Sequence, residues 1–140
     1  MKLNLGKCIN ITANRKQSTI RFIDGTVDPR KPRATYLGAI LIEDFNNTAE
    51  IHNRISDCTN TANKLKLFWN KANTEISWKL QVFNAIIRSK LLYGLETIQL
   101  TNAEKNRINA FHIKCLRRIL KIPPTFEDKL WTNDRVIEKT

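Results

Sequence analysis

Residues Ile76 to Ile122 read ISWKLQVFNAIIRSKLLYGLETIQLTNAEKNRINAFHIKCLRRILKI, and this stretch decides the fold class. In its first part, apolar residues recur every three or four positions, at Ile76, Leu80, Phe83, Ile87 and Leu91. That spacing follows one face of an α-helix of about 3.6 residues per turn. Tyr93-Gly94 predicts the end of this helix, because glycine adopts a positive φ without a Cβ clash.

The second part of the stretch predicts a basic helix that begins after Thr101. Thr101 and Glu104 form the pattern of a capping box, in which each side chain bonds the other residue's backbone N–H. The apolar positions of this helix are Ile108, Phe111, Cys115, Ile119 and Ile122. Pro123-Pro124 then end it, since proline lacks an N–H and disfavours helical backbone at the residue before it.

The chain before this stretch divides into a β-rich part and a long helix. Residues 7–12, 19–23 and 34–42 read as short strands, with Asp24-Gly25 as a turn and Gly38 as a bulge or close backbone approach. Residues 48–71 read as a helix that ends before Asn73-Thr74. Its predicted packing seam is Ile51, Ile55, Cys58, Ala62, Leu65, Trp69 and Ala72.

These elements predict an α+β fold, in which a small N-terminal β piece precedes a three-helix bundle. The expected parts are residues 1–45, residues 46–124 and a C-terminal tail, residues 125–140. The tail reads either as a short terminal helix or as frayed chain. Three short strands bury little core of their own, so we expect the β piece to need a partner.

The net charge of +11 is unevenly distributed along the chain. Residues 1–33 carry eight Lys/Arg against two Asp/Glu, and residues 101–122 carry six against one. Two basic blocks around a neutral middle favour a polyanion partner, RNA or DNA, over a basic surface kept only for solubility. No apolar run suits a membrane span or a secretory signal, so we expect an intracellular protein of the nucleus or cytoplasm, without a membrane partner.

The cysteines predict reduced thiols and no metal site. Cys8, Cys58 and Cys115 are odd in number and form no CxxC pair. His112 and Cys115 share a helical face, but two ligands do not make a site, and Cys115 lies on the apolar stripe. We therefore expect Cys115 to be a core residue.

Several segments, taken in order, resemble a known family. They are KLNLGKC (2–8), TYLGAIL (35–41), EIHNRI (50–55), LLYGLET (91–97) and CLRRILKI (115–122). In this order and spacing the chain resembles, over residues 1–125, the C-terminal part of a non-LTR (LINE-type) retrotransposon reverse transcriptase. The resemblance implies a partial palm over residues 1–45 and a thumb-like bundle over residues 46–124.

The resemblance also implies roles for single residues. Lys7 matches the motif D lysine near the departing pyrophosphate. Residues 34–42 resemble the primer-grip hairpin, with Tyr36, Leu37 and Gly38 near the primer end. The family's catalytic Asp-Asp box is absent from this chain, which resembles the family only from just after that box. We therefore expect no polymerase activity from this chain alone and no cofactor in it, with Mg²⁺ needed only in a full-length polymerase that supplies the missing portions.

The residues themselves predict a nucleic-acid grip on the basic helix. The candidate phosphate-binding side chains are Lys105, Arg107, Lys114, Arg117, Arg118 and Lys121, with Lys114, Arg117 and Lys121 expected on one face. Trp69, Trp78, Tyr93 and Phe111 are candidates for base stacking, of which Trp78 lies off its apolar stripe. Two alternatives stay open: an independent basic nucleic-acid-binding module, and a helical protein-interaction domain that uses the seam at 51–72.

Overall fold

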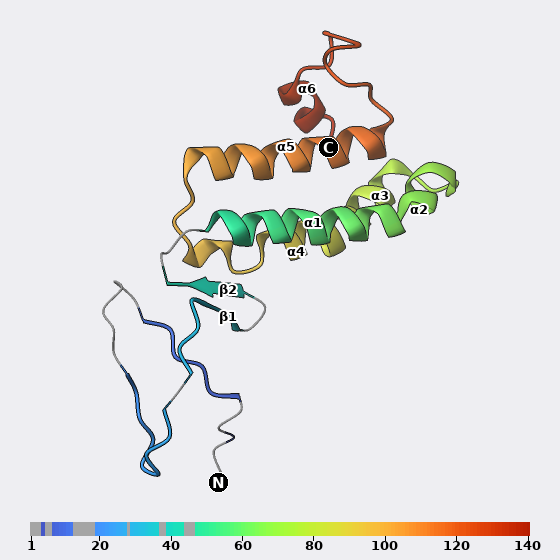
Figure 1. Ribbon diagram of the computed structural model, residues 1–140. Helices are drawn as coiled ribbons and strands as arrows, with labels where there is room; N and C mark the ends of the chain where they lie inside the picture. The colour runs from blue at the N-terminus through green and yellow to red at the C-terminus, as the bar shows by residue number, and fades with distance from the viewer. Residues whose placement is uncertain (1–3, 5–6, 13–18, 28, 37–38, 44–46) are drawn as a thin grey trace. The chain divides into compact units, whose positions relative to one another are not determined.

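The computed structural model describes residues 4, 7–12, 19–27, 29–36, 39–43 and 47–140. The chain divides into two units, Met1–Glu50 and Ile51–Thr140. Most of the described chain is helical, and strands occur only in the first unit (Figure 1). At this coarse level, an α-rich chain with a small β component, the predicted class is confirmed.

The first unit contains one antiparallel hairpin. Strands β1 (Arg33–Tyr36) and β2 (Ala39–Ile42) pair from Arg33 opposite Ile42 to Tyr36 opposite Ala39. The single strand predicted from the apolar pattern of residues 34–42 was therefore wrong, and the chain forms there the hairpin that the resemblance implied. An apolar run interrupted by glycine fits a bulged strand and a tight hairpin equally well, so its pattern alone could not distinguish them.

The other two predicted strands are reduced to single bridges. Asn10 pairs with Arg30, and Arg21 pairs with Val27, outside any extended ladder. The turn between Arg21 and Val27 is confirmed, since Gly25 has φ 83° and donates to the Phe22 carbonyl oxygen at 2.9 Å. These segments pair too briefly to form strands.

The second unit begins with a helix that is broken once. Helix α1 (Thr48–Lys64) and helix α2 (Lys66–Lys71) replace the single helix predicted over residues 48–71. The break is at Leu65, whose ψ of 8° departs from helical geometry. The predicted seam still faces inward, with Ile51, Cys58, Ala62 and Trp69 all buried.

The next rod runs as α3 (Ile76–Val82), a π-helical segment η3 (Phe83–Arg88) and α4 (Ser89–Leu92). A π segment turns less per residue than an α-helix. Across this segment Phe83, Ile87 and Leu91, four residues apart, are all buried, and Lys79 before it is buried as well. The predicted stripe is buried at Phe83, Ile87 and Leu91, and Leu80 packs partly buried against the core. Ile76 is instead exposed, and Lys79 is buried.

The connection after α4 follows the prediction. Gly94 has φ 69°, and a 3₁₀ turn η4 (Leu95–Thr97) leads to helix α5 (Asn102–Leu120). Arg54 of α1 is buried and donates to the Tyr93 carbonyl oxygen, which ties this turn to α1. Helix α6 (Asn133–Glu138) packs on α5, so the tail is a short helix and not frayed chain.

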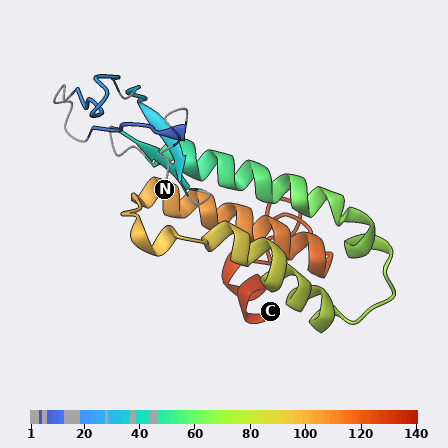
Figure 2. The same cartoon turned by 90° about the horizontal axis from the view of Figure 1, so that it is seen from below.

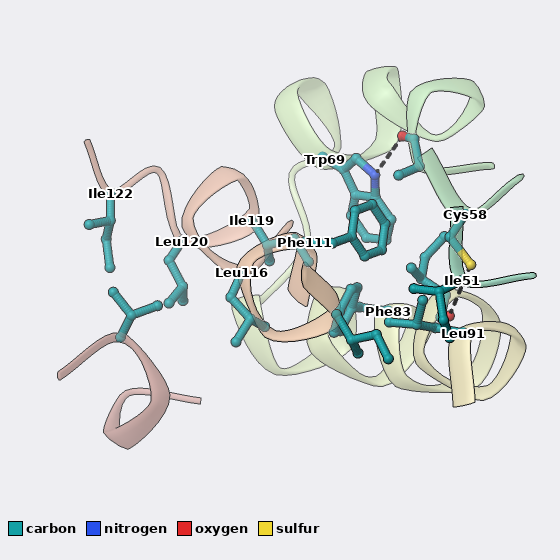
Figure 3. Close-up of a cluster of buried hydrophobic side chains, with 14 of the residues drawn as sticks. Ile51, Cys58, Trp69, Phe83, Leu91, Phe111, Leu116, Ile119, Leu120 and Ile122 are labelled. Carbon is teal, nitrogen blue, oxygen red and sulfur yellow. Dashed lines mark hydrogen bonds between the residues drawn. The ribbon is translucent and has the colours of Figure 1, made fainter. Parts of the chain in front are cut away.

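The helices of the second unit form one bundle around a shared core. Figures 1 and 2 show α1 and α5 side by side, with the α3–α4 rod against them and α6 along α5. Trp69, Phe83 and Phe111 meet in the interior, and Trp69 Nε1 donates to the Ala62 carbonyl oxygen at 3.1 Å (Figure 3). Burial of Ile51, Cys58 and Leu91 closes the α1 side of this core.

Candidate nucleic-acid interface

Helix α5 is fixed at both ends by contacts of its own sequence. The capping box is present: Glu104 N–H donates to Thr101 Oγ1 at 3.3 Å, and Thr101 N–H donates to Glu104 Oε2 at 2.8 Å. At the other end Lys121 adopts φ 55°, and Ile122 N–H donates to the Arg117 carbonyl oxygen at 2.9 Å. The direction and length of the basic helix are thus set locally.

The two sides of α5 differ in character. Ile108, Phe111 and Ile119 are buried in the core. Beside this apolar face, about a quarter turn around the helix, lie Arg107, Lys114 and Arg118, all exposed, and Lys121 follows at the helix end. We call these four residues the outer basic row. At about 1.5 Å rise per residue, Arg107 and Arg118 are about 16 Å apart along the axis.

Helix α1 borders this row with uncharged polar side chains. Arg107 Nη1 lies 3.2 Å from His52 Nε2, and Arg118 Nη1 donates to Asn63 Oδ1 at 3.1 Å. A guanidinium can only donate, so the His52 Nε2 atom accepts. The sequence distance from His52 to Asn63 on α1 equals that from Arg107 to Arg118 on α5. The two helices therefore run parallel and in register here.

Between these two bridges α1 continues the polar edge. Ser56 and Thr59 are exposed and share the helical face of His52 and Asn63. Asp57, the nearest acidic residue of α1, lies on another face and pairs with Lys90 at 4.0 Å. The outer basic row is therefore bordered by hydrogen-bonding groups and not by neutralising carboxylates of α1.

Arg117, which is predicted to bind phosphate, has acceptors of its own within the fold. Its guanidinium donates to the Pro123 and Trp131 carbonyl oxygens, both at 2.6 Å, to Thr125 Oγ1 at 2.9 Å and to Asn133 Oδ1 at 3.2 Å. These bonds occupy its donors on both sides of the fork. Arg117 thus anchors the C-terminal segment, and we leave it out of the outer basic row.

Lys105 is also separated from the row. It is two residues before Arg107, about 200° around the helix, and lines a different hollow with Leu92, Leu95 and Glu96. Within the part of the chain that the structure describes, the side chains of Lys105, Lys114 and Lys121 have no hydrogen bond or ion pair. Of the six predicted cations, the structure brings four together on one surface.

The candidates in the first unit lie apart from this surface in the sequence and are described separately. Lys7 is exposed, and its N–H donates to the Asn4 carbonyl oxygen at 3.0 Å. Tyr36 is exposed at the end of β1. Leu37 and Gly38 fall outside the described residues. Glu43, which sequence reasoning did not select, pairs with Arg30 and accepts from Thr12 Oγ1 at 3.3 Å.

The aromatic candidates divide into two kinds. Trp69 and Phe111 are buried in the core and cannot stack on a base. Trp78 and Tyr93 are exposed and stay candidates. Phe126, not predicted, is 81% exposed after α5 and lines a groove beside the basic row. The signal that could have found it is an aromatic residue directly after a basic helix and a proline pair.

The thiols and histidines near the core show no sign of reactivity. The structure leaves Cys8, Cys58 and Cys115 free, as predicted, and burial raises the pKa of Cys115 to about 11. His112 stacks on Phe83 at 5.4 Å between ring centroids, and burial lowers its pKa, as does Arg88 nearby. Among the described residues no three His, Cys, Asp or Glu side chains form a metal-binding group.

None of the described helices is long and apolar enough to cross a membrane. Comparison of the chain with protein-family models, with curated proteins and with solved structures gave no match. The resemblance to a reverse transcriptase therefore stays a prediction.

Proposed function

We propose that the helical unit binds the phosphate backbone of a nucleic acid along the outer basic row of α5. The observation that carries this proposal is the alignment of Arg107, Lys114, Arg118 and Lys121 on one exposed face, bordered by a polar edge of α1. Arginine and lysine bind phosphate oxygens, and hydroxyls and amides such as those of Ser56 and Asn63 add contacts to the same groups.

This arrangement suits backbone contacts without sequence recognition. The row is straight, solvent-exposed and carried by long, flexible side chains, which follow a line of charges. The two arginines are already oriented by His52 and Asn63, so less side-chain freedom is lost when they bind. Binding should therefore vary strongly with salt and little with base sequence.

We further propose that the chain is the primer-grip and thumb portion of an RNA-directed DNA polymerase of the non-LTR type. This rests on the five resembling segments, of which CLRRILKI supplies part of the outer basic row. In this proposal Lys7 and Tyr36 keep their family roles only when the catalytic Asp-Asp box is supplied. Primer extension by the purified chain with Mg²⁺ would contradict the expectation that it has no polymerase activity.

The two alternatives, a helical interaction domain and an independent binding module, differ in what each would require of the fold. An interaction domain that uses the seam at 51–72 would need that seam exposed, whereas Ile51, Cys58 and Trp69 are buried in the chain's own core. The stability of the hairpin distinguishes an independent binding module from a palm remnant. A palm remnant predicts fast amide exchange in β1 and β2, since two strands alone are marginal. Strong protection there would favour the independent module.

The binding proposal is tested by fluorescence anisotropy with a labelled duplex over a range of salt concentrations. Four neutralised phosphates predict a log–log slope of about −3.6 for a B-form duplex, at about −0.9 per phosphate. Lys114→Gln and Arg118→Gln should each reduce the slope by about 0.9. Lys71→Gln, on α2 and outside the row, is the matched control and should leave the slope unchanged. A slope near zero, or equal losses in all three variants, would contradict the proposal.

A further inference from the structure

A groove lies beside the outer basic row, between α5 and the segment that follows it. Its volume is about 560 Å³, within the range of about 300–1,000 Å³ typical of ligand pockets. The apolar part of its lining is Ala110, Ile113, Ile122, Pro124 and Phe126. Lys114 and Arg118 of the row line the same groove, so the apolar surface and the cations are continuous.

The groove is held open by the fold itself. Arg117, at its base, bonds the Pro123 and Trp131 carbonyl oxygens and Asn133 Oδ1, which fixes the segment that forms the far wall. Because its guanidinium is used in this way, the cations left for a ligand are Lys114 and Arg118. None of the described residues that line the groove is acidic.

Phe126 gives this groove its chemical character. Its side chain is 81% exposed although it is a large aromatic group next to an apolar surface. An aromatic ring beside a line of cations is the arrangement by which proteins bind single-stranded nucleic acid, the bases stacking on the ring while the cations follow the backbone. A base in a duplex presents no free face to such a ring.

We propose that this groove takes an unstacked base of a single-stranded nucleic acid, with Phe126 as the stacking platform and Lys114 and Arg118 on the adjoining phosphates. This rests on the proposed phosphate binding and narrows its ligand from any nucleic acid to one with a single-stranded stretch. An acidic peptide with an aromatic side chain would fit the groove too. Such a peptide would not use Arg107, which belongs to the same row but lies outside the groove. We therefore favour the nucleic acid.

The test compares three labelled probes on the full chain: a single strand of about 12 nucleotides, an abasic strand with the same number of phosphates, and a duplex of that length. Phe126→Ala should weaken binding of the single strand by about fivefold or more, the effect expected for loss of one stacked base. It should leave the abasic strand and the duplex unchanged. Leu130→Ala, a second exposed apolar residue of the same segment, is the matched control and should change nothing.

A second variant, which gains a signal, distinguishes loss of base stacking from a folding defect. Phe126→Trp should retain single-strand affinity, and its added emission should be quenched by the single strand and not by the abasic strand. Equal effects of Phe126→Ala on all three probes, or no effect on any, would overturn the inference while Lys114→Gln still reports on phosphate binding. Failure of every probe to bind would instead refute the proposed function. Phe126-dependent binding of an acidic aromatic peptide, with no base-dependent binding, would assign the groove to a protein partner.

Discussion

Arg117 Nη2 donates a hydrogen bond of 2.6 Å to the carbonyl oxygen of Trp131, so one cation of the basic helix is used inside the fold. Its neighbour in the sequence, Arg118, instead donates to Asn63 Oδ1 of α1 at 3.1 Å. Adjacent residues of a helix are about 100° apart, and here that rotation gives Arg117 acceptors in the C-terminal segment and places Arg118 in the row that we propose binds phosphate.

The first prediction follows from this division. Arg117→Met should lower the free energy of unfolding by about 1.5–3 kcal/mol, because several carbonyl and side-chain acceptors lose a charged donor. Lys114→Met, one turn away and exposed, should change it by no more than about 0.5 kcal/mol. Urea unfolding followed by circular dichroism measures both. Equal stabilities, with equal losses of nucleic-acid affinity, would show that Arg117 belongs to the binding row after all.

The second prediction concerns Lys121, which adopts a left-handed conformation at φ 55°. Lys121→Gly should raise the free energy of unfolding by about 0.5–1 kcal/mol, because glycine takes this conformation without a Cβ clash. The same variant should reduce the salt slope of binding, since one cation of the row is removed. Lys121→Ala is the control: it removes the charge and keeps the Cβ, so it should show the binding loss without added stability.

The third prediction concerns the tryptophans on either side of the α2–α3 connection, Trp69 in α2 and Trp78 in α3. Trp69 is 2% exposed, and Trp69→Ala should cost about 3–5 kcal/mol of stability. Trp78 is 60% exposed, and Trp78→Ala should change stability by no more than about 0.5 kcal/mol. Thermal unfolding with matched fluorescence spectra would show both. A large loss from Trp78→Ala would mean that its ring is covered in solution.

The fourth prediction is a dependence of stability on pH. Burial lowers the pKa of His112 in the folded state below its ordinary value of 6.5. The unfolded chain then binds the proton more readily, so the contribution of His112 is fully present above about pH 6.5 and is lost as the pH falls through that region. Urea unfolding at about pH 7.5 and at about pH 5.5 should show this loss. His112→Gln should show a smaller difference between the two, and an unchanged difference would contradict the assignment.

Much of the helical unit was predictable because its signals are local. The Thr101–Glu104 capping box, the left-handed Gly94 and the Pro123-Pro124 stop act within one turn of the chain, so sequence alone placed the ends of α5 and its neighbour. The apolar spacing of residues 51–72 likewise predicted a buried seam. Local contacts of this kind do not depend on which other element packs nearby.

The errors have the opposite origin. The single strand over residues 34–42 is a hairpin, because pairing depends on a partner strand that a local pattern does not identify. The predicted stripe also misplaced the start of α3, where Lys79 is buried and Ile76 is exposed. The Lys79 ammonium donates there to the Trp69 carbonyl oxygen at 3.1 Å, a contact between α3 and α2.

The sequence by itself determined that α5 is a helix, where it begins and ends, and that it is basic, because capping, proline and charge are properties of the residues in order. Only the tertiary structure decided which of the six similar cations are used inside the fold and which lie together on one exposed surface. The guanidinium of Arg117 bonds the C-terminal segment, and Lys105 lines another hollow. Side chains of α1 hydrogen-bond Arg107 and Arg118. The physical reason is that a cation's role depends on the acceptors around it, and those acceptors come from distant parts of the chain.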